Sequence, residues 1–165
     1  MKKLKSRGLN NLKTVHLILV SMWLGGGIAL VVMINALYFE KGEALFGYLY
    51  AMKIVDDFII IPGAMGNLLI GILYGVLTGW GFFKHKWITV KWILTVSLIL
   101  FGTFYLGPMV NGSVDIAEKL SESSVKDPEI ASNLLKLNIW GSIQILFLIF
   151  MMYISVFKPW KKKRS

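Results

Sequence analysis

Four apolar segments, each long enough to cross a lipid bilayer, constrain this chain more than any other feature of its sequence. They cover residues 15–39, 58–83, 87–107 and 137–157. A helix needs about 20 apolar residues to span the hydrocarbon core. Such segments are too long for barrel strands, and lipid cannot satisfy open backbone groups, so each segment must be helical. With 56% hydrophobic residues overall, the chain is predicted to be an all-α integral membrane protein, a four-helix transmembrane bundle.

The distribution of charge predicts how this bundle is oriented in the lipid bilayer. Five basic residues precede the first segment, two lie between the second and third, and five follow the fourth. All nine acidic residues lie in the other two connections, residues 40–57 and 108–136. By the positive-inside rule, both termini are cytoplasmic and the protein is a multi-pass protein of the cell membrane. We therefore interpret the net charge of +9 as a topology signal and expect no nucleic-acid partner.

The chain is expected to form one domain with two outer loops, residues 40–57 and 108–136. The first loop carries apolar residues at helical spacing, which predicts a short interfacial helix. In the second loop, Asp127 followed by Pro128 is typical of an N-cap and a first helical residue, so the fourth helix should begin there. Pro62 should lie near the outer end of the second helix, where its missing N–H costs little.

One face of the second helix is almost without side chains. Gly63, Asn67, Gly71, Gly75 and Gly79 follow one another at intervals of four residues. Such a face favours close packing against another helix. We expect either packing within the chain or a second copy or membrane partner docked on the Gly71, Gly75 and Gly79 part of the face. The alternative is a channel wall or a surface that a cofactor approaches.

Uncharged polar residues occur inside the apolar segments, but carboxylates do not. We expect Asn35, Asn67 and Gln144 to form hydrogen bonds between helices. No carboxylate lies deep within any of the four segments, which argues against a proton-coupled exporter.

An imidazole and an ammonium group are predicted to lie at similar depth near the cytoplasmic ends of two helices. His16 lies about one turn into the first segment and Lys91 about one turn into the third. Ionisable groups are costly within a membrane and mark functional sites, so both are candidate ligand-binding residues. The alternatives are an interfacial histidine bonded to a carbonyl, and a lysine whose stem reaches the headgroups. Trp23 lies on the same helix face as His16, and the glycines at 25–27 let a backbone or a flat ligand approach closely.

Several kinds of chemistry lack the residues that they need. The chain has no cysteine, which excludes thiol redox chemistry, disulfides and thiolate metal sites. Two histidines cannot hold two bis-histidine haems. The eight methionines are scattered and form no closely spaced pair for copper(I). The sequence also has no glycine-rich phosphate loop and no nucleophile–base pattern.

Three short motifs resemble a bacterial membrane superfamily. They are Lys13-Thr-Val-His16 followed by Met22-Trp23-Leu24-Gly25-Gly26, then Trp87-Ile-Thr-Val-Lys91-Trp92, and Asp57-Phe-Ile-Ile-Ile-Pro62-Gly63. The superfamily includes the copper-resistance protein CopD, the HemJ-type protoporphyrinogen oxidases and an uncharacterised family of small four-helix membrane proteins. The third motif and the length of the chain are most similar to the small four-helix family. The resemblance covers most of residues 12–110 and implies a bacterial plasma membrane.

The HemJ-type enzymes imply a bound haem with a critical histidine and lysine, which here match His16 and Lys91. The resemblance thus implies haem b or a related tetrapyrrole, with His16 as the metal ligand, Lys91 on a propionate or as second ligand, and Gly25 and Gly26 giving the ring room. Those enzymes carry an arginine and a further histidine after the Trp-Gly element, whereas residues 28–37 of this chain are uncharged. This departure argues against oxidase activity. The CopD resemblance implies copper handling or a non-enzymatic accessory role as the alternative.

Overall fold

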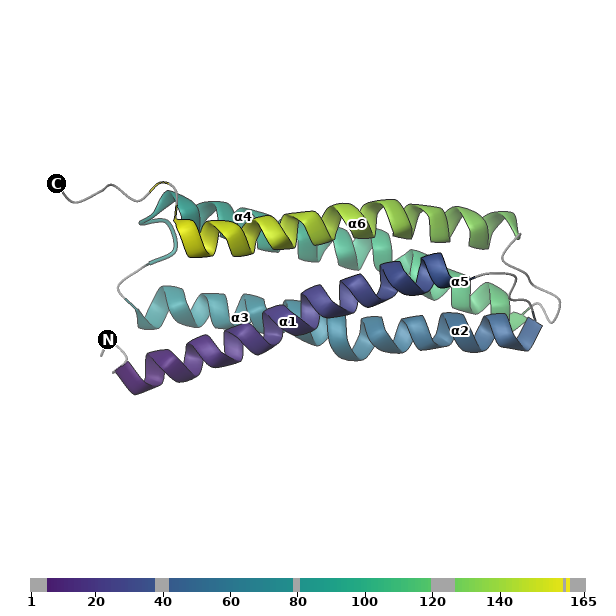
Figure 1. The fold of residues 1–165 in the computed structure, drawn as a ribbon, viewed down its shortest axis with the longest axis horizontal. Coiled ribbons are helices and arrows are strands. Elements are labelled where there is room, and N and C mark those ends of the chain that lie inside the picture. Colours follow the sequence, from purple (N-terminus) through teal and green to yellow (C-terminus); the bar gives the residue numbers. More distant parts are fainter. Residues whose placement is uncertain (1–5, 38–41, 79–80, 120–126, 159, 161–165) are drawn as a thin grey trace.

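Four long helices make up the part of the chain that the structure, a computed structural model, describes: residues 6–37, 42–78, 81–119, 127–158 and 160. The elements are α1 (Ser6–Ala36), α2 (Gly42–Val55), η1 (Asp56–Ile60), α3 (Ile61–Leu77), α4 (Lys86–Phe101), η2 (Gly102–Leu106), α5 (Gly107–Lys119) and α6 (Pro128–Phe157). Because η1 and η2 are π-helical, α2, η1 and α3 run on as one helix, and so do α4, η2 and α5. The predicted all-α four-helix bundle is confirmed (Figure 1).

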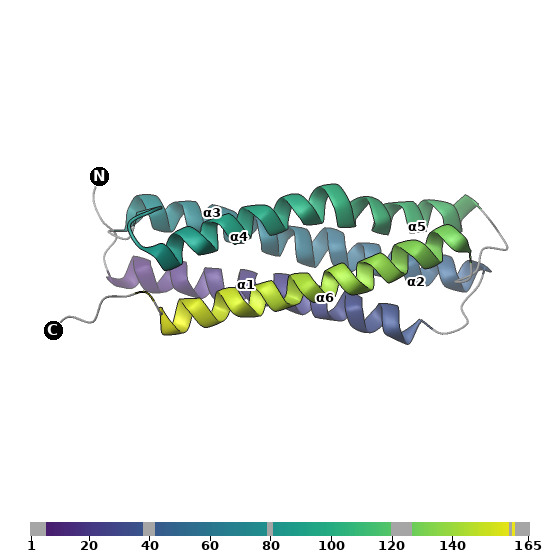
Figure 2. The same ribbon diagram turned by 90° about the horizontal axis from the view of Figure 1, so that it is seen from above.

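The four helices lie side by side in an up-and-down bundle (Figures 1 and 2). α1 packs against α3 and α6, while α5 packs against α2 and α6. The start of α1, the end of α3, the start of α4 and the end of α6 lie at one end, which we term the terminal end; the opposite end is the far end. All four helices are long and apolar enough to cross a membrane, as expected for a multi-pass membrane protein.

The second and third helices continue well beyond the segments that were expected to span the membrane. Residues 42–57, expected to be an outer loop with a separate interfacial helix, form α2 and the start of η1 and continue into α3. Residues 108–119 of the other expected loop belong to α5. The helix predicted in the first stretch is present but is continuous with α3 instead of separate, and the second stretch is helical where a loop was expected because it buries one side against neighbouring helices. The buried side chains of α5 are Val110, Ser113, Val114 and Ala117.

These extensions form a core of their own at the far end of the bundle. Its buried members come from α2, α5, the start of α6 and Leu37, which directly follows α1: Leu37, Leu45, Leu49, Met52, Val114, Ala117, Ile130 and Leu134. The charged side chains of Asp115, Glu118 and Glu129 are exposed around this core. The far end therefore has an apolar interior and carries charged side chains on part of its surface.

Each π-helical segment ends two residues before a proline. η1 ends at Ile60 and is followed by Pro62, while η2 ends at Leu106 and is followed by Pro108. A proline within a helix has no N–H to donate, and its ring clashes with the carbonyl four residues earlier; a local π turn relieves both problems. Pro62 therefore lies within the 34-residue helix Ala44–Leu77, and the prediction that it sits near a helix end was wrong.

Local chemistry sets the position of two helix boundaries. The second long helix ends at Leu77, six residues before the expected end, because Thr78 is extended and Gly81 adopts a positive φ of 62°, a conformation that glycine adopts without strain. The predicted N-cap of α6 is confirmed. The Asp127 carboxylate accepts two backbone N–H bonds from the first turn of that helix, at 3.0 and 3.3 Å.

Two of the three polar residues expected to join helices do so. Asn35 on α1 exchanges hydrogen bonds of 3.0 and 3.2 Å with Asn138 on α6. The Gln144 Nε2 of α6 donates to the Leu98 carbonyl of α4 at 2.9 Å. Asn67 instead donates to a carbonyl of its own helix, and its amide oxygen accepts no hydrogen bond within the described residues.

The glycine face of α3 packs closely against α1, as predicted. A Cβ at Gly63 would lie 2.7 Å from the Trp23 nitrogen and 3.0 Å from the Leu19 carbonyl oxygen. Both are backbone atoms, so the two helices approach closely only because this residue has no side chain.

The rest of the same face is covered by aromatic side chains of this chain. A Cβ at Gly71 would lie 3.5 Å from the Trp92 ring, and one at Gly75 would lie 2.5 Å from the Phe82 ring. Gly79, the third residue of the expected partner surface, lies outside the described residues. Gly71 and Gly75 therefore contact their own chain, and nothing in the structure favours a second copy or a partner there.

We predict that Gly63→Ala destabilises the protein, by about 1–3 kcal/mol, because the added methyl group must push two backbones apart. Gly47→Ala is the matched control, since Gly47 is exposed on α2 with nothing within 4 Å of its Cβ position. That change should stabilise by up to about 1 kcal/mol through helix propensity. Unfolding in mixed micelles, followed by circular dichroism, measures both. Equal stability of the two variants would contradict the close α1–α3 contact.

Candidate functional site

A polar cluster near the terminal end joins side chains from all four helices. It consists of His16 on α1, Asn67 and Tyr74 on α3, Lys91 on α4 and Ser155 on α6; we term it the His16–Lys91 cluster. The Lys91 ammonium donates a hydrogen bond to the Ser155 hydroxyl. The rings of His16 and Tyr74 meet edge to face, with centroids 5.9 Å apart. The charge of Lys91 also acts on the His16 imidazole, so the two residues singled out in the sequence do converge.

The centre of this cluster holds two polar atoms without partners. His16 Nδ1 and Asn67 Oδ1 are buried and have no hydrogen-bond partner among the described residues. The two side chains are close enough to interact but do not meet hydrogen-bonding geometry. Unpaired buried polar atoms are costly, and in native proteins they are usually bonded to water, an ion or a ligand. The cluster therefore has unused hydrogen-bonding capacity.

Lys91 faces the interior of the bundle. Its side chain is half-buried and bonded to Ser155 across the α4–α6 interface. One turn further along α4, the Thr95 hydroxyl contacts the Met151 sulfur at 3.6 Å. Lys91 and Thr95 therefore both face α6. The hydrogen bond joins the ammonium to α6 two residues before that helix ends.

The other residues expected at the site lie elsewhere on α1. Trp23 is two turns from His16, where it is 4% exposed and belongs to an apolar layer. Gly26 is buried against η1, since a Cβ there would lie 2.6 Å from the Ile60 side chain. Gly25 is exposed and has nothing within 4 Å of its Cβ position. Neither glycine borders the His16–Lys91 cluster. The prediction that they do could not be checked from the sequence, which does not reveal which side of α1 meets η1.

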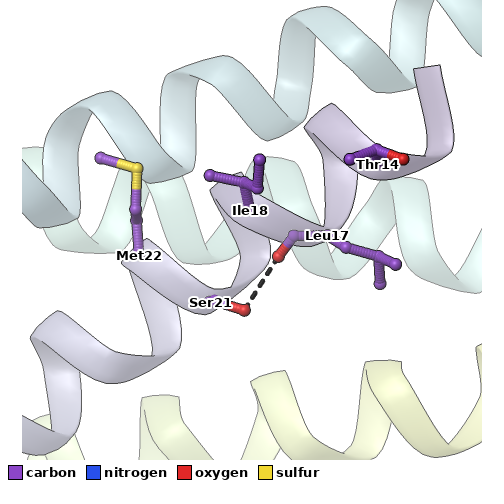
Figure 3. Close-up of a pocket in the computed structure, with 5 residues that line it drawn as sticks. All are labelled: Thr14, Leu17, Ile18, Ser21 and Met22. Carbon is purple, nitrogen blue, oxygen red and sulfur yellow. Dashed lines mark hydrogen bonds between the residues drawn. The ribbon is translucent and has the colours of Figure 1, made fainter. Parts of the chain in front are cut away.

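A groove of about 500 Å³ lies on the exposed surface of α1, and Figure 3 shows the residues that line it. It is lined by Thr14, Leu17, Ile18, Ser21 and Met22. The Ser21 hydroxyl donates to the Leu17 carbonyl of its own helix at 2.9 Å. The groove has no charged lining residue and lies on an exposed side of α1, which is compatible with contact to lipid.

A larger feature was missed by sequence reasoning: a cavity of about 520 Å³ between the helices of the bundle, which we term the central cavity. It opens to the surface beside Ile61 and Met65, which line it and are exposed. Residues of all four long helices line it, and both π-helical segments contribute. Its charged lining residues, within the described part of the chain, are Asp56 and Asp57. Both were assigned to an outer loop, whereas η1 places them inside a continuous helix. The sequence feature that could have indicated this site is the pair of adjacent carboxylates a few residues before Pro62.

An apolar layer separates the central cavity from the His16–Lys91 cluster. It comprises Trp23, Ala64, Leu98, Leu148 and Met151. All of these except Met151 also line the cavity, so the layer forms its wall toward the terminal end. The bundle therefore contains two polar regions at different levels.

The described residues contain no group of three or more His, Asp or Glu side chains that could hold a metal ion. Comparison with known proteins gives no match: no family model matches the chain, and no curated protein or solved structure is significantly similar to it.

We predict energetic coupling between Lys91 and Ser155. Lys91→Met keeps the apolar stem but removes the donor, and a hydrogen bond to a charged group contributes about 1.5–3 kcal/mol to stability. In a double-mutant cycle with Ser155→Ala, the coupling should be about 1 kcal/mol or more. Lys86→Met is the control, because Lys86 is exposed at the start of α4, and its effect should add to that of Ser155→Ala. Additive effects for the Lys91 pair would show that the bond contributes nothing.

Proposed function

We propose that this multi-pass membrane protein binds haem b or a related tetrapyrrole at the His16–Lys91 cluster. The observation that carries the proposal is the convergence of a histidine from α1 and a lysine from α4 inside the bundle, beside a buried imidazole nitrogen that has no partner in the described residues. The resemblance of the His16 and Lys91 motifs to haem-binding membrane proteins supports the same ligand.

The side chains of the cluster suit the parts of such a ligand. A histidine nitrogen is a common axial ligand of haem iron, and a lysine ammonium pairs with a carboxylate such as a propionate. His16 would hold the iron, and Lys91 would exchange its bond to Ser155 for one to the propionate. Bound haem would supply a redox-active iron within the membrane. Asn67 Oδ1 remains available to accept a hydrogen bond from the imidazole, which would fix the orientation of the ring.

Room for a flat ring beside the cluster would have to come from the glycine face of α3, which aromatic side chains cover. Gly71 follows Asn67 by one helical turn and so lies next to the cluster. It is covered by the Trp92 ring, which packs against Phe82 with centroids 5.4 Å apart. Aromatic side chains can rotate away, whereas the backbone contact at Gly63 cannot. Displacement of these two rings would open a slot beside His16 with glycine on one wall. This matches the alternative that a cofactor approaches the glycine face of this helix.

The ultraviolet–visible spectrum of the purified protein, oxidised and then reduced, tests this function. After expression with ample haem, the wild-type protein should show a Soret band and sharp reduced bands. His16→Ala should lose them, whereas His85→Ala should not, because His85 lies outside the cluster and stacks on Trp87. Lys91→Met should weaken haem binding about tenfold, or 1.4 kcal/mol, and Lys86→Met should have no effect.

A full Soret band in His16→Ala would disprove the ligand assignment. A featureless wild-type spectrum would disprove the function itself and leave copper handling or an accessory role.

We further propose that the protein lies in the cell membrane with its terminal end in the cytoplasm, from the concentration of basic residues at that end. The chain has no cysteine, so single cysteines report accessibility cleanly. Glu118→Cys, exposed on α5, should react with a membrane-impermeant maleimide in intact cells. Ser6→Cys, exposed at the start of α1, should react only after the membrane is permeabilised. The reverse pattern would invert the orientation.

A further inference from the structure

The central cavity has the size and the wall chemistry of a small-molecule site. Its volume of about 520 Å³ falls within the roughly 300–1,000 Å³ typical of ligand pockets. Most of its wall is apolar, contributed by residues such as Trp23, Leu98 and Leu148. Among the polar lining groups, Gln144 Nε2 already donates to a backbone carbonyl and Asn111 Oδ1 already accepts from Lys53. These contacts fix both amide side chains in place.

The charges at the cavity do not balance. Lys53 lies 2.9 Å from the Asp57 carboxylate and also donates to Asn111, so it ties η1 to α5 and neutralises one carboxylate. Asp56 has no ion pair and no hydrogen bond within the described residues, yet it is half-buried and lines the cavity. The two carboxylates and one ammonium leave a net charge of −1. A carboxylate removed from water is compensated by a cation or a hydrogen-bond donor, or else it takes up a proton.

From this charge and shape we propose that the central cavity binds a compact apolar molecule with one protonated amine. The amine donates a charge-assisted hydrogen bond to Asp56, while the apolar body fills the space between the four helices. An anion is excluded by the two carboxylates, and a fully neutral apolar molecule leaves Asp56 uncompensated. The site is separated from the His16–Lys91 cluster by the apolar layer and does not depend on haem binding.

Equilibrium dialysis with a pair of shape-matched probes tests the proposal. The protein in nanodiscs of zwitterionic lipid is dialysed against radiolabelled 1-adamantanamine or 1-adamantanol, and empty nanodiscs give the lipid background. The two probes share one hydrocarbon cage and differ in the charged ammonium group. We expect one saturable site per chain, with the amine bound at least tenfold more tightly than the alcohol.

Matched variants locate the charge that creates this preference. Asp56→Asn should abolish the preference for the amine while leaving binding of the alcohol unchanged, which also shows that the variant is folded. Asp115→Asn, which removes an exposed carboxylate from α5, should keep the preference, and His16→Ala should keep it too. Three results would overturn the proposal: binding no greater than that of empty nanodiscs, equal affinity for the two probes, or an Asp56→Asn variant that still prefers the amine.

Discussion

Two prolines within apolar helices impose the constraint on which much of this structure depends. Pro62 and Pro108 lie in neighbouring long helices, and each leaves a carbonyl without its usual donor where lipid can supply none. Both helices respond with one π-helical segment immediately before the proline. The chain thus keeps two uninterrupted helices instead of four short ones. Both widened turns border the same central cavity, so the backbone adjustment and the space inside the bundle occur together.

Packing then separates the interior polar groups into two levels. The close α1–α3 contact at Gly63 holds Trp23 in the apolar layer between them. On one side of this layer lie His16 and Lys91, and on the other lie the carboxylates of η1. Buried polar groups in an apolar bundle are usually paired, and each level has polar groups without a partner among the described residues: His16 Nδ1 and Asn67 Oδ1 at one level and Asp56 at the other. These groups are the basis of the two binding sites that we propose.

The helical class, the cap at Asp127 and the packing role of Gly63 could be predicted because each depends on local pattern: hydropathy, side-chain chemistry and residue spacing. The convergence of His16 and Lys91 could be suspected from their matched depth, but the order and rotation of the helices decide it. The central cavity could not be predicted, since hydropathy assigned Asp56 and Asp57 to a loop. Averaging hydropathy along the sequence detects helices that are apolar on most sides. It misses helices such as α5, which bury an apolar side against the protein and carry polar residues on the other side.

The helices are longer than a bilayer requires. α1 has 31 residues and is about 46 Å long, compared with about 30 Å for the hydrocarbon core of a bilayer. Hydrophobic burial in water weakens on cooling, whereas helices within lipid associate through packing and polar contacts. Because the apolar interior continues without a break into the far-end core, bilayers of different thickness can cover different lengths of the bundle without breaking a helix.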